Sequence, residues 1–191
     1  MKKKYHLLVK VLIIFSFLTN PVYAELKDEL IKKIQDTNTL SFKFKQNIAN
    51  KIETGNCIIK YPKLIKCDYN DSYKKRLISN GKTLVIIQRR YKKIFYYPLS
   101  TTPLYFILDK KLLVDFINNN DAVVLNGSML KYEILEKNKK FIIFFDKNTL
   151  NLKGWKTEDI YKNTVNFSIT NLKINIPVDN NLFKIPNADN L

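Results

Sequence analysis

The chain has 191 residues, of which 46% are hydrophobic and 26% are charged. This composition is typical of one folded domain with a core, and a total of four glycines nearly excludes collagen, glycine-rich linkers and phosphate-binding glycine loops. The formal net charge is +16, but only three of the 33 basic residues are arginine, which bidentate recognition of phosphates and bases favours. We therefore expect no nucleic-acid partner, and we expect the lysines to attract acidic protein surfaces.

The first 24 residues have the three parts of an export signal. A run of lysines precedes an apolar stretch over 7–18, and Val22-Tyr23-Ala24 then offers small residues at the positions that a signal peptidase reads. The apolar stretch has about 12 residues, short of the roughly 20 that span a bilayer, so we expect cleavage after this tripeptide and not a membrane anchor. Glu25, and not the cysteine of a lipoprotein, follows the site. The prediction is a cleaved signal peptide over 1–24 and a monomeric periplasmic domain over 25–191.

The single histidine of the chain, His6, falls within the predicted signal. Cleavage would leave no histidine and, with the loss of four lysines, would lower the net charge from +16 to +12. This excludes Ser-His-Asp and Cys-His nucleophile systems as well as histidine-ligated zinc or haem. No GxSxG, Walker or HExxH motif occurs. We therefore expect no enzyme activity, no cofactor and no metal.

Hydrophobic periodicity separates helix from strand along the mature chain. Leu26, Leu30, Ile31 and Ile34 form one apolar stripe, which predicts a helix over 25–36. Alternation of apolar and polar residues predicts strands over 40–48, 55–61, 64–69, 76–79, 83–88, 93–97, near 123, and over 130–136, 141–146, 150–156 and 164–172.

Two short motifs mark connections between these strands. Asn80-Gly81, between two predicted strands, is the strongest short signal for a β-hairpin. Thr102-Pro103 has the pattern of a helix N-cap followed by proline at the first helical position. The apolar residues over 104–108 and 112–117 lack the period of a strand. We expect one or two short helices there, lying between two groups of strands.

The two cysteines, Cys57 and Cys67, are equidistant from Pro62, the centre of a predicted turn. Residues directly opposite each other on a hairpin bring their β-carbons to roughly 4.5–5.5 Å, near the separation that a disulfide needs. In an exported protein this predicts a structural disulfide. A redox-active pair is disfavoured because the spacing is not CxxC and no helix N-terminus is there to lower a thiol pKa. A two-ligand metal site is disfavoured further.

The fold class that we predict is mainly β: an incomplete, half-open antiparallel β-barrel of about 11 strands, with an N-terminal helix and a short helical lid. A sheet this long must curl, and a curled sheet of more than about eight strands leaves interior space. Aromatic strand faces are also what an ordinary sandwich core would show. The separate apolar helical segment favours a cavity for a long, apolar ligand.

The order of several short motifs resembles the LolA family of periplasmic carriers of outer-membrane lipoproteins. The resemblance covers essentially the whole mature chain and implies an incomplete barrel of eleven antiparallel strands with helices as a lid. The matching segments are Phe42-Lys43-Phe44-Lys45-Gln46, Gly55 with Tyr61-Pro62 and Tyr69, Leu77-Ile78-Ser79-Asn80-Gly81-Lys82-Thr83-Leu84, Thr102-Pro103 with Ile107-Leu108, and Phe183-Lys184-Ile185-Pro186.

Two positions depart from the family pattern. The family often has a basic residue directly before the proline of its second hairpin, where it helps to hold the lid shut. Here that position is Tyr61, with Lys60 beside it, so we expect lid closure to rest on different contacts. Where the family often has an interior tryptophan, this chain has Cys67, which replaces cavity-lining area with a covalent crosslink.

The resemblance implies a periplasmic chaperone that shields the acyl chains of lipoproteins released from the inner membrane and delivers them to the outer membrane. Its partners would be acylated outer-membrane lipoproteins, the lipoprotein-releasing ABC transporter of the inner membrane and, if one exists, a LolB-like acceptor. LolB shares the fold but is itself a lipoprotein, which the missing cysteine after Ala24 argues against here. The alternative is a LolA-like sensor or adaptor in envelope-stress signalling that binds a protein and not a lipid.

The expected acyl-binding residues are apolar residues of the first strands, although alternation alone does not say which face points inward. A lid of three residues would fill the empty cavity and move away on loading. The candidates are Phe42, Phe44, Ile59, Ile65, Leu84, Ile86 and Phe95 for the acyl cavity, Leu104, Ile107 and Leu108 for the lid, and Tyr61 for the lid contact position.

Overall fold

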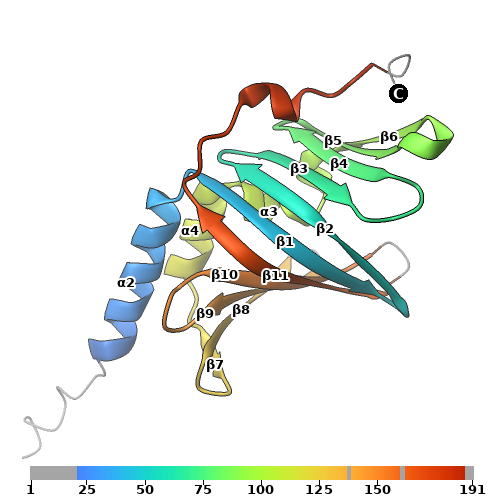
Figure 1. The fold of residues 1–191 in the computed structure, drawn as a ribbon. Helices are drawn as coiled ribbons and strands as arrows, with labels where there is room; N and C mark the ends of the chain where they lie inside the picture. The colour runs from blue at the N-terminus through green and yellow to red at the C-terminus, as the bar shows by residue number, and fades with distance from the viewer. Residues whose placement is uncertain (1–20, 137–138, 160–161, 188–191) are drawn as a thin grey trace, which may run out of the picture.

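The structure of the protein is a computed structural model that describes residues 21–136, 139–159 and 162–187. The described residues form one antiparallel sheet of eleven strands, in the order β6-β5-β4-β3-β2-β1-β11-β10-β9-β8-β7 (Figure 1). The strands are β1 (Thr39–Ile48), β2 (Lys51–Lys60), β3 (Leu64–Tyr69), β4 (Lys75–Asn80), β5 (Thr83–Gln88), β6 (Lys93–Pro98), β7 (Val123–Leu125), β8 (Met129–Glu136), β9 (Lys139–Asp146), β10 (Leu152–Glu158) and β11 (Thr164–Ile174).

The helices follow the predicted stripe and the predicted insertion. They are α2 (Pro21–Asp36), α3 (Leu104–Leu108) and α4 (Lys110–Asn118), with short 3-10 turns η2 (Arg89–Tyr91), η3 (Leu99–Thr101) and η4 (Asn180–Phe183). Because α2 begins at Pro21, the predicted cleavage site after Ala24 lies inside this helix. Residues 1–20, which contain His6 and most of the predicted signal peptide, lie outside the described residues.

The sheet curls around α3 and α4 without closing (Figure 1). Its two ends, β6 and β7, do not pair with each other, so the predicted half-open barrel is confirmed. The main core lies between the concave face of the sheet and the three helices. Leu30 and Ile34 of α2 are buried in it, with Leu26 and Ile31 packed against it. The expected apolar stripe therefore faces the core.

Cross-strand pairing decides which residues share the concave face. Residues directly opposite each other in neighbouring strands point to the same side of a sheet. Two such rows run across the first six strands. The Leu40 row consists of Leu40, Ile59, Ile65, Ser79, Leu84 and Tyr97, and the Phe42 row consists of Phe42, Cys57, Cys67, Leu77, Ile86 and Phe95.

The convex face of strands β4 and β5 has a smaller apolar cluster of its own. Ile78, Val85 and Ile87 are buried there, with Ile94 and Ile185 packed against them. The segment after β11 thus returns over the back of the sheet. Lys60 helps to hold it, because its ammonium donates to the side chain of Asn180 at 2.6 Å.

Two predicted hairpins are confirmed and one helix cap is corrected. Gly81, between β4 and β5, has a φ of +97°, which only glycine adopts readily, and the Asn80 carboxamide accepts from the backbone N–H of Thr83 at 2.9 Å. Cys57 pairs with Cys67 across β2 and β3, and the two form the predicted disulfide. The prediction of Thr102 as an N-cap was wrong: its hydroxyl donates back to the carbonyl of Leu99, and no side chain caps α3.

The disulfide should contribute to stability chiefly by constraining the unfolded chain. It closes a short loop, with a sequence separation of 10 residues. We expect reduction by dithiothreitol to lower the free energy of unfolding by about 2–3 kcal/mol, measured by urea denaturation. A Cys57→Ala/Cys67→Ala variant is the matched control and should not respond to the reductant. Equal responses of the two proteins would contradict the prediction.

Candidate functional site

A cavity of about 120 Å³ lies on the concave side of the sheet, beneath the start of the helical insertion. Strands from both halves of the sheet contribute to its wall, so neither half could form it alone. Its lining residues are Gln46, Ile65, Cys67, Tyr69, Leu77, Pro103, Leu104, Trp155, Thr157, Val165 and Phe167.

Stacked aromatic rings form one wall of this cavity. Trp155 of β10 stacks on Phe167 of β11 with ring centroids 4.0 Å apart, and Phe167 stacks on Phe44 of β1 at 4.8 Å. Phe44 meets Tyr69 edge-to-face at 4.9 Å. Gly55 makes room for this packing, because a Cβ there would lie 2.2 Å from the carbonyl oxygen of Asp68 and 2.7 Å from the Phe44 ring. The wall is therefore rigid and apolar, as suits an aliphatic ligand.

One end of the cavity is polar, and a cluster of charged side chains adjoins it through Gln46. Gln46 donates to the carboxylate of Glu53 at 3.0 Å, and the ammonium groups of Lys75 and Lys51 lie 2.6 and 2.7 Å from it. Burial by itself raises the pKa of Glu53, but these lysines outweigh burial and hold that pKa below its ordinary value. Burial raises the pKa of the Tyr69 phenol, which stays neutral beneath the Lys75 ammonium. This end of the cavity therefore offers polar contacts beside the apolar wall.

The lid, defined as α3 and α4, packs against the concave side of the sheet. Ile107 and Leu108 are fully buried, and Phe106 stacks on Phe141 of β9 with centroids 6.2 Å apart. Leu104 is only partly buried and faces the remaining cavity. Pockets for small-molecule ligands usually measure roughly 300–1,000 Å³, well above 120 Å³. A larger ligand would therefore have to displace the lid.

A polar latch joins the lid to the turn between β2 and β3. The ammonium of Lys63 lies 3.0 Å from the carboxylate of Asp109, and the backbone N–H of Lys63 donates to the carbonyl of Leu108 at 2.9 Å. The same ammonium lies over the ring of Tyr105, 5.1 Å from its centroid. Asp109 is also the N-cap of α4 and accepts from the backbone N–H of Leu112. One carboxylate therefore both starts the second lid helix and holds it to the sheet.

Tyr61, the predicted lid contact position, lies close to the start of α4. The ammonium of Lys110, in α4, lies over the Tyr61 ring at 5.4 Å and donates to the carbonyl of Gln35 at 2.7 Å. Burial raises the pKa of the Tyr61 phenol, so it carries no charge here. Lys60 points to the C-terminal segment and takes no part. The ion pair of the latch comes instead from Lys63, which sequence reasoning missed.

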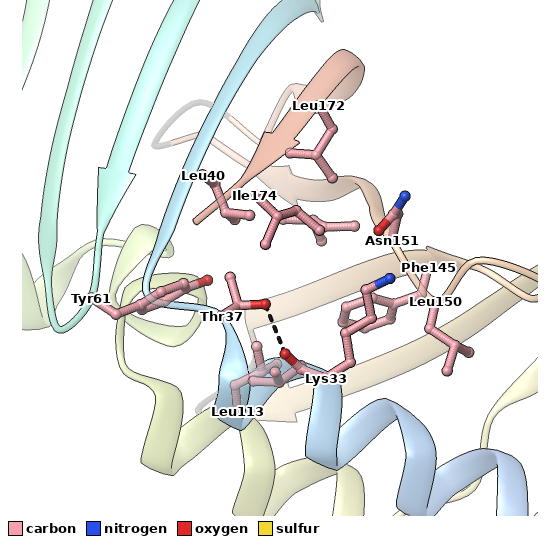
Figure 2. Close-up of a pocket in the computed structure, with 12 residues that line it drawn as sticks. Lys33, Thr37, Leu40, Tyr61, Leu113, Phe145, Leu150, Asn151, Leu172 and Ile174 are labelled. Atoms are coloured by element: carbon pink, nitrogen blue, oxygen red, sulfur yellow. Dashed lines mark hydrogen bonds between the residues drawn. The ribbon is translucent and has the colours of Figure 1, made fainter. Parts of the chain in front are cut away.

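A second cavity lies next to Tyr61, where the end of α2 meets α4 and the second half of the sheet. It measures about 30 Å³ and is lined by residues that include Lys33, Leu113 and Phe145 (Figure 2). The ammonium of Lys33 donates to the carbonyl of Thr149 across its edge. Such a volume has room for about one water molecule, so we regard this cavity as a packing gap and not as a candidate site.

The predicted cavity residues lie on one face but are not equally placed. All of them belong to the Leu40 row or the Phe42 row except Phe44, whose ring reaches the aromatic wall from the same face of β1. Ile65 lines the cavity directly, whereas Phe95 is 41% exposed beyond it. Sequence reasoning missed Trp155 and Phe167. Alternation in 164–172 was the available signal for Phe167, but nothing local tells that β11 pairs with β1.

The described residues contain no group of three or more histidine, cysteine, aspartate or glutamate side chains placed to hold a metal ion. Among the same residues, no helix is long and apolar enough to cross a membrane.

The chain can be compared with known proteins. A family model described as "Outer membrane lipoprotein carrier protein LolA" matches residues 35–186. No curated protein matches the sequence. An uncharacterized conserved protein from Thermus thermophilus is 7% identical, with a TM-score of 0.52 over 85% of this chain and 94% of that chain. A LolA superfamily protein from Nitrosomonas europaea is 7% identical, with a TM-score of 0.44 over 86% and 99%. One chain in the MucA/MucB complex of Pseudomonas aeruginosa is 11% identical, with a TM-score of 0.44 over 83% of this chain and 60% of that chain. These structural likenesses concern the fold alone.

We expect Asp109 to control lid opening through two separable contacts. Asp109→Asn keeps an acceptor for the helix cap but loses the charge that Lys63 binds, so it should raise hydrogen–deuterium exchange over 104–118. Asp109→Ala also loses the cap and should cost about 1 kcal/mol of stability in addition. The matched control is Asp121→Asn, which removes the ion pair with Lys27 at a carboxylate that is 96% exposed. Equal lid exchange in Asp109→Asn and this control would contradict the latch.

The latch should respond only to strongly acidic pH. Burial raises the pKa of Asp109, but the hydrogen bonds from Lys63 and from the backbone of Leu112 outweigh it and keep that pKa below its ordinary value of 3.8. A carboxyl with a lowered pKa stabilises the fold above its unfolded pKa and loses this contribution as pH falls through the folded one. The difference in melting temperature between wild type and Asp109→Asn should persist from pH 8 to about pH 4. Its disappearance between about pH 7 and about pH 5 would contradict this.

Proposed function

Because the chain belongs to the LolA family, we propose that it is a periplasmic carrier that shields the acyl chains of lipoproteins released from the inner membrane and delivers them to the outer membrane. The observation that carries the proposal is an apolar concave face covered by a separate helical lid, which packs on it through apolar side chains and is joined to its rim by an ion pair. Such a face has no role in an enzyme of the classes considered above, and it suits a long aliphatic ligand.

On loading, an acyl chain would replace the lid helices on the concave face of the sheet. Each CH₂ group of an acyl chain that leaves water contributes about 0.8 kcal/mol. Displacing the lid offsets part of this gain, because Ile107 and Leu108 then lose the contacts that bury them completely. The net affinity is therefore modest, and an acceptor with a permanently open apolar site can withdraw the ligand.

The polar end of the cavity suits the part of a lipoprotein where its acyl chains join the polypeptide. Glu53, Lys51 and Lys75 form an ion cluster at the end of the cavity lined by Gln46 and Tyr69. The Gln46 amide, the Tyr69 phenol and the lysine ammonium groups can bind ester and amide groups of the ligand. The acyl chains would then run from this cluster beneath the lid.

The proposed partners are acylated outer-membrane lipoproteins, the inner-membrane ABC transporter that releases them, and a LolB-like acceptor if one exists. The disulfide between Cys57 and Cys67 supports an oxidising compartment such as the periplasm. In the alternative, a protein-binding adaptor for envelope signalling, the lid would stay shut and a protein would bind elsewhere on the sheet.

The one tryptophan of the chain is a built-in probe for acyl chains. Trp155 lines the cavity beside Leu104. Because bromine quenches tryptophan fluorescence on contact, titration with a brominated diacyl lipopeptide should quench Trp155 in a saturable manner. The unbrominated lipopeptide and the deacylated peptide are controls and should not quench it. Saturable binding of the deacylated peptide without any quenching by the brominated one would favour the adaptor.

Charge introduced under the lid should abolish loading. Ile65→Glu places a carboxylate on the apolar surface that the acyl chain would cover, so it should lose the quenching of Trp155. Ile107→Glu instead weakens the packing of the lid that competes for this surface, so it should load at lower lipopeptide concentration than the wild type. Leu135→Glu, at a side chain that is 75% exposed on β8, is the matched control and should load normally. Ile65→Ala serves where the charged variant fails to fold, which circular dichroism reveals. Normal loading in a folded Ile65→Glu protein would refute the cavity.

A further inference from the structure

The free edge of the sheet exposes aromatic side chains that the carrier cavity does not use. Strand β6 ends the sheet, with β5 as its partner on one side only. Phe95, Tyr96 and Tyr97 are 41%, 57% and 42% exposed along it. Phe95 and Tyr97 extend the concave rows, whereas Tyr96 pairs with Val85 and points to the convex face. The aromatic rings therefore project from both faces of the same edge.

Two further tyrosines lie at the neighbouring loops. Tyr91, in the connection from β5 to β6, is 51% exposed, and Tyr73, in the loop from β3 to β4, is 38% exposed. Their ring centroids lie 5.6 Å apart, and the backbone N–H of Arg90 donates to the carbonyl of Tyr73 at 3.2 Å. Within the part of the chain that the structure describes, every exposed large aromatic side chain belongs to the patch formed by Tyr73, Tyr91, Phe95, Tyr96 and Tyr97.

Basic residues interleave with this aromatic patch. Arg89, Arg90, Lys92 and Lys93 are all exposed, and no acidic residue occurs from 89 to 98. Two of the three arginines of the chain are therefore in this connection. Over 21–136, 139–159 and 162–187, none of these four residues forms an ion pair with a carboxylate. Their charge is thus available to an external anionic partner.

We propose that the β6 edge docks on the surface of an anionic phospholipid bilayer. Tyrosine rings concentrate at the boundary between headgroups and acyl chains, and each lysine or arginine near an anionic leaflet strengthens binding roughly fivefold. A protein partner would need a complementary surface on each face of the sheet and on two loops at once. A bilayer interface has no fixed shape and accommodates rings that point in several directions.

Docking at this edge would also orient the concave face. The Leu40 row ends in Tyr97 and the Phe42 row ends in Phe95, so the apolar face runs out to the strand that touches the bilayer. An acyl chain could then pass between membrane and cavity without crossing water. This consequence rests on the proposed carrier function, whereas the docking itself does not.

The test is co-sedimentation of the ligand-free protein with vesicles. We expect the protein to bind vesicles of phosphatidylcholine that contain about 30% of the anionic lipid phosphatidylglycerol. This binding should weaken as the salt concentration is raised. Replacing Arg89, Arg90, Lys92 and Lys93 by Gln should weaken it at least about tenfold. The matched control replaces four exposed lysines on other strands by Gln: Lys43, Lys45, Lys156 and Lys173.

The aromatic rings are tested separately from the charges. A Tyr91→Ser/Tyr96→Ser variant keeps every charge and should lose roughly tenfold in binding to the same vesicles. No binding by the wild type, equal weakening in both four-residue Gln variants, or full binding without these tyrosines would overturn the proposal. Quenching of Trp155 by the brominated lipopeptide in detergent-free solution should be unchanged in all of these variants. That second measurement distinguishes a failed docking surface from a failed carrier function.

Discussion

The central constraint on this protein is that a large apolar concave surface must never face water. The sheet curls but does not close, so its inner face needs a cover, and the buried side chains of α3 supply it in the unloaded protein. In the proposed cycle an acyl chain takes the same place. In that cycle lid and ligand would compete for one surface, and the burial of Ile107 and Leu108 would set how tightly a ligand binds.

In the proposed cycle, the polar contacts at the rim would decide when the lid opens while contributing little to the overall stability of the fold. Lys63 and Asp109 join the turn of the disulfide hairpin to the start of α4, so the lid is held to one of the most constrained parts of the sheet. A partly exposed ion pair contributes little to overall stability, but it selects the closed position among similar packings. The aromatic wall of Trp155, Phe167 and Phe44 belongs to the sheet and not to the lid.

The open sheet has a second consequence at its free edge. An unpaired strand usually invites aggregation, and proteins protect such edges with charge. Here β6 has basic residues at one end but exposed aromatic rings along its length, so the protection is incomplete. Docking on a bilayer would make this exposed edge useful, because the concave rows end there. Because the sheet curls without closing, it both encloses the cavity and leaves a free edge, and the proposed docking would make that edge a route to the cavity.

Local patterns in the sequence determined the strands, the helices and the disulfide of this protein. Alternation needs only neighbouring residues, and the symmetry of Cys57 and Cys67 about Pro62 is a property of one hairpin. The tertiary structure alone decided that β11 pairs with β1, which brings Trp155 and Phe167 from the distant second half of the chain to the cavity that Ile65 also lines. It also decided that Lys63, and not the residue before Pro62, meets Asp109. Such contacts depend on how the sheet curls and on where the lid packs against it. Neither can be predicted from the alternation of residues within a short segment.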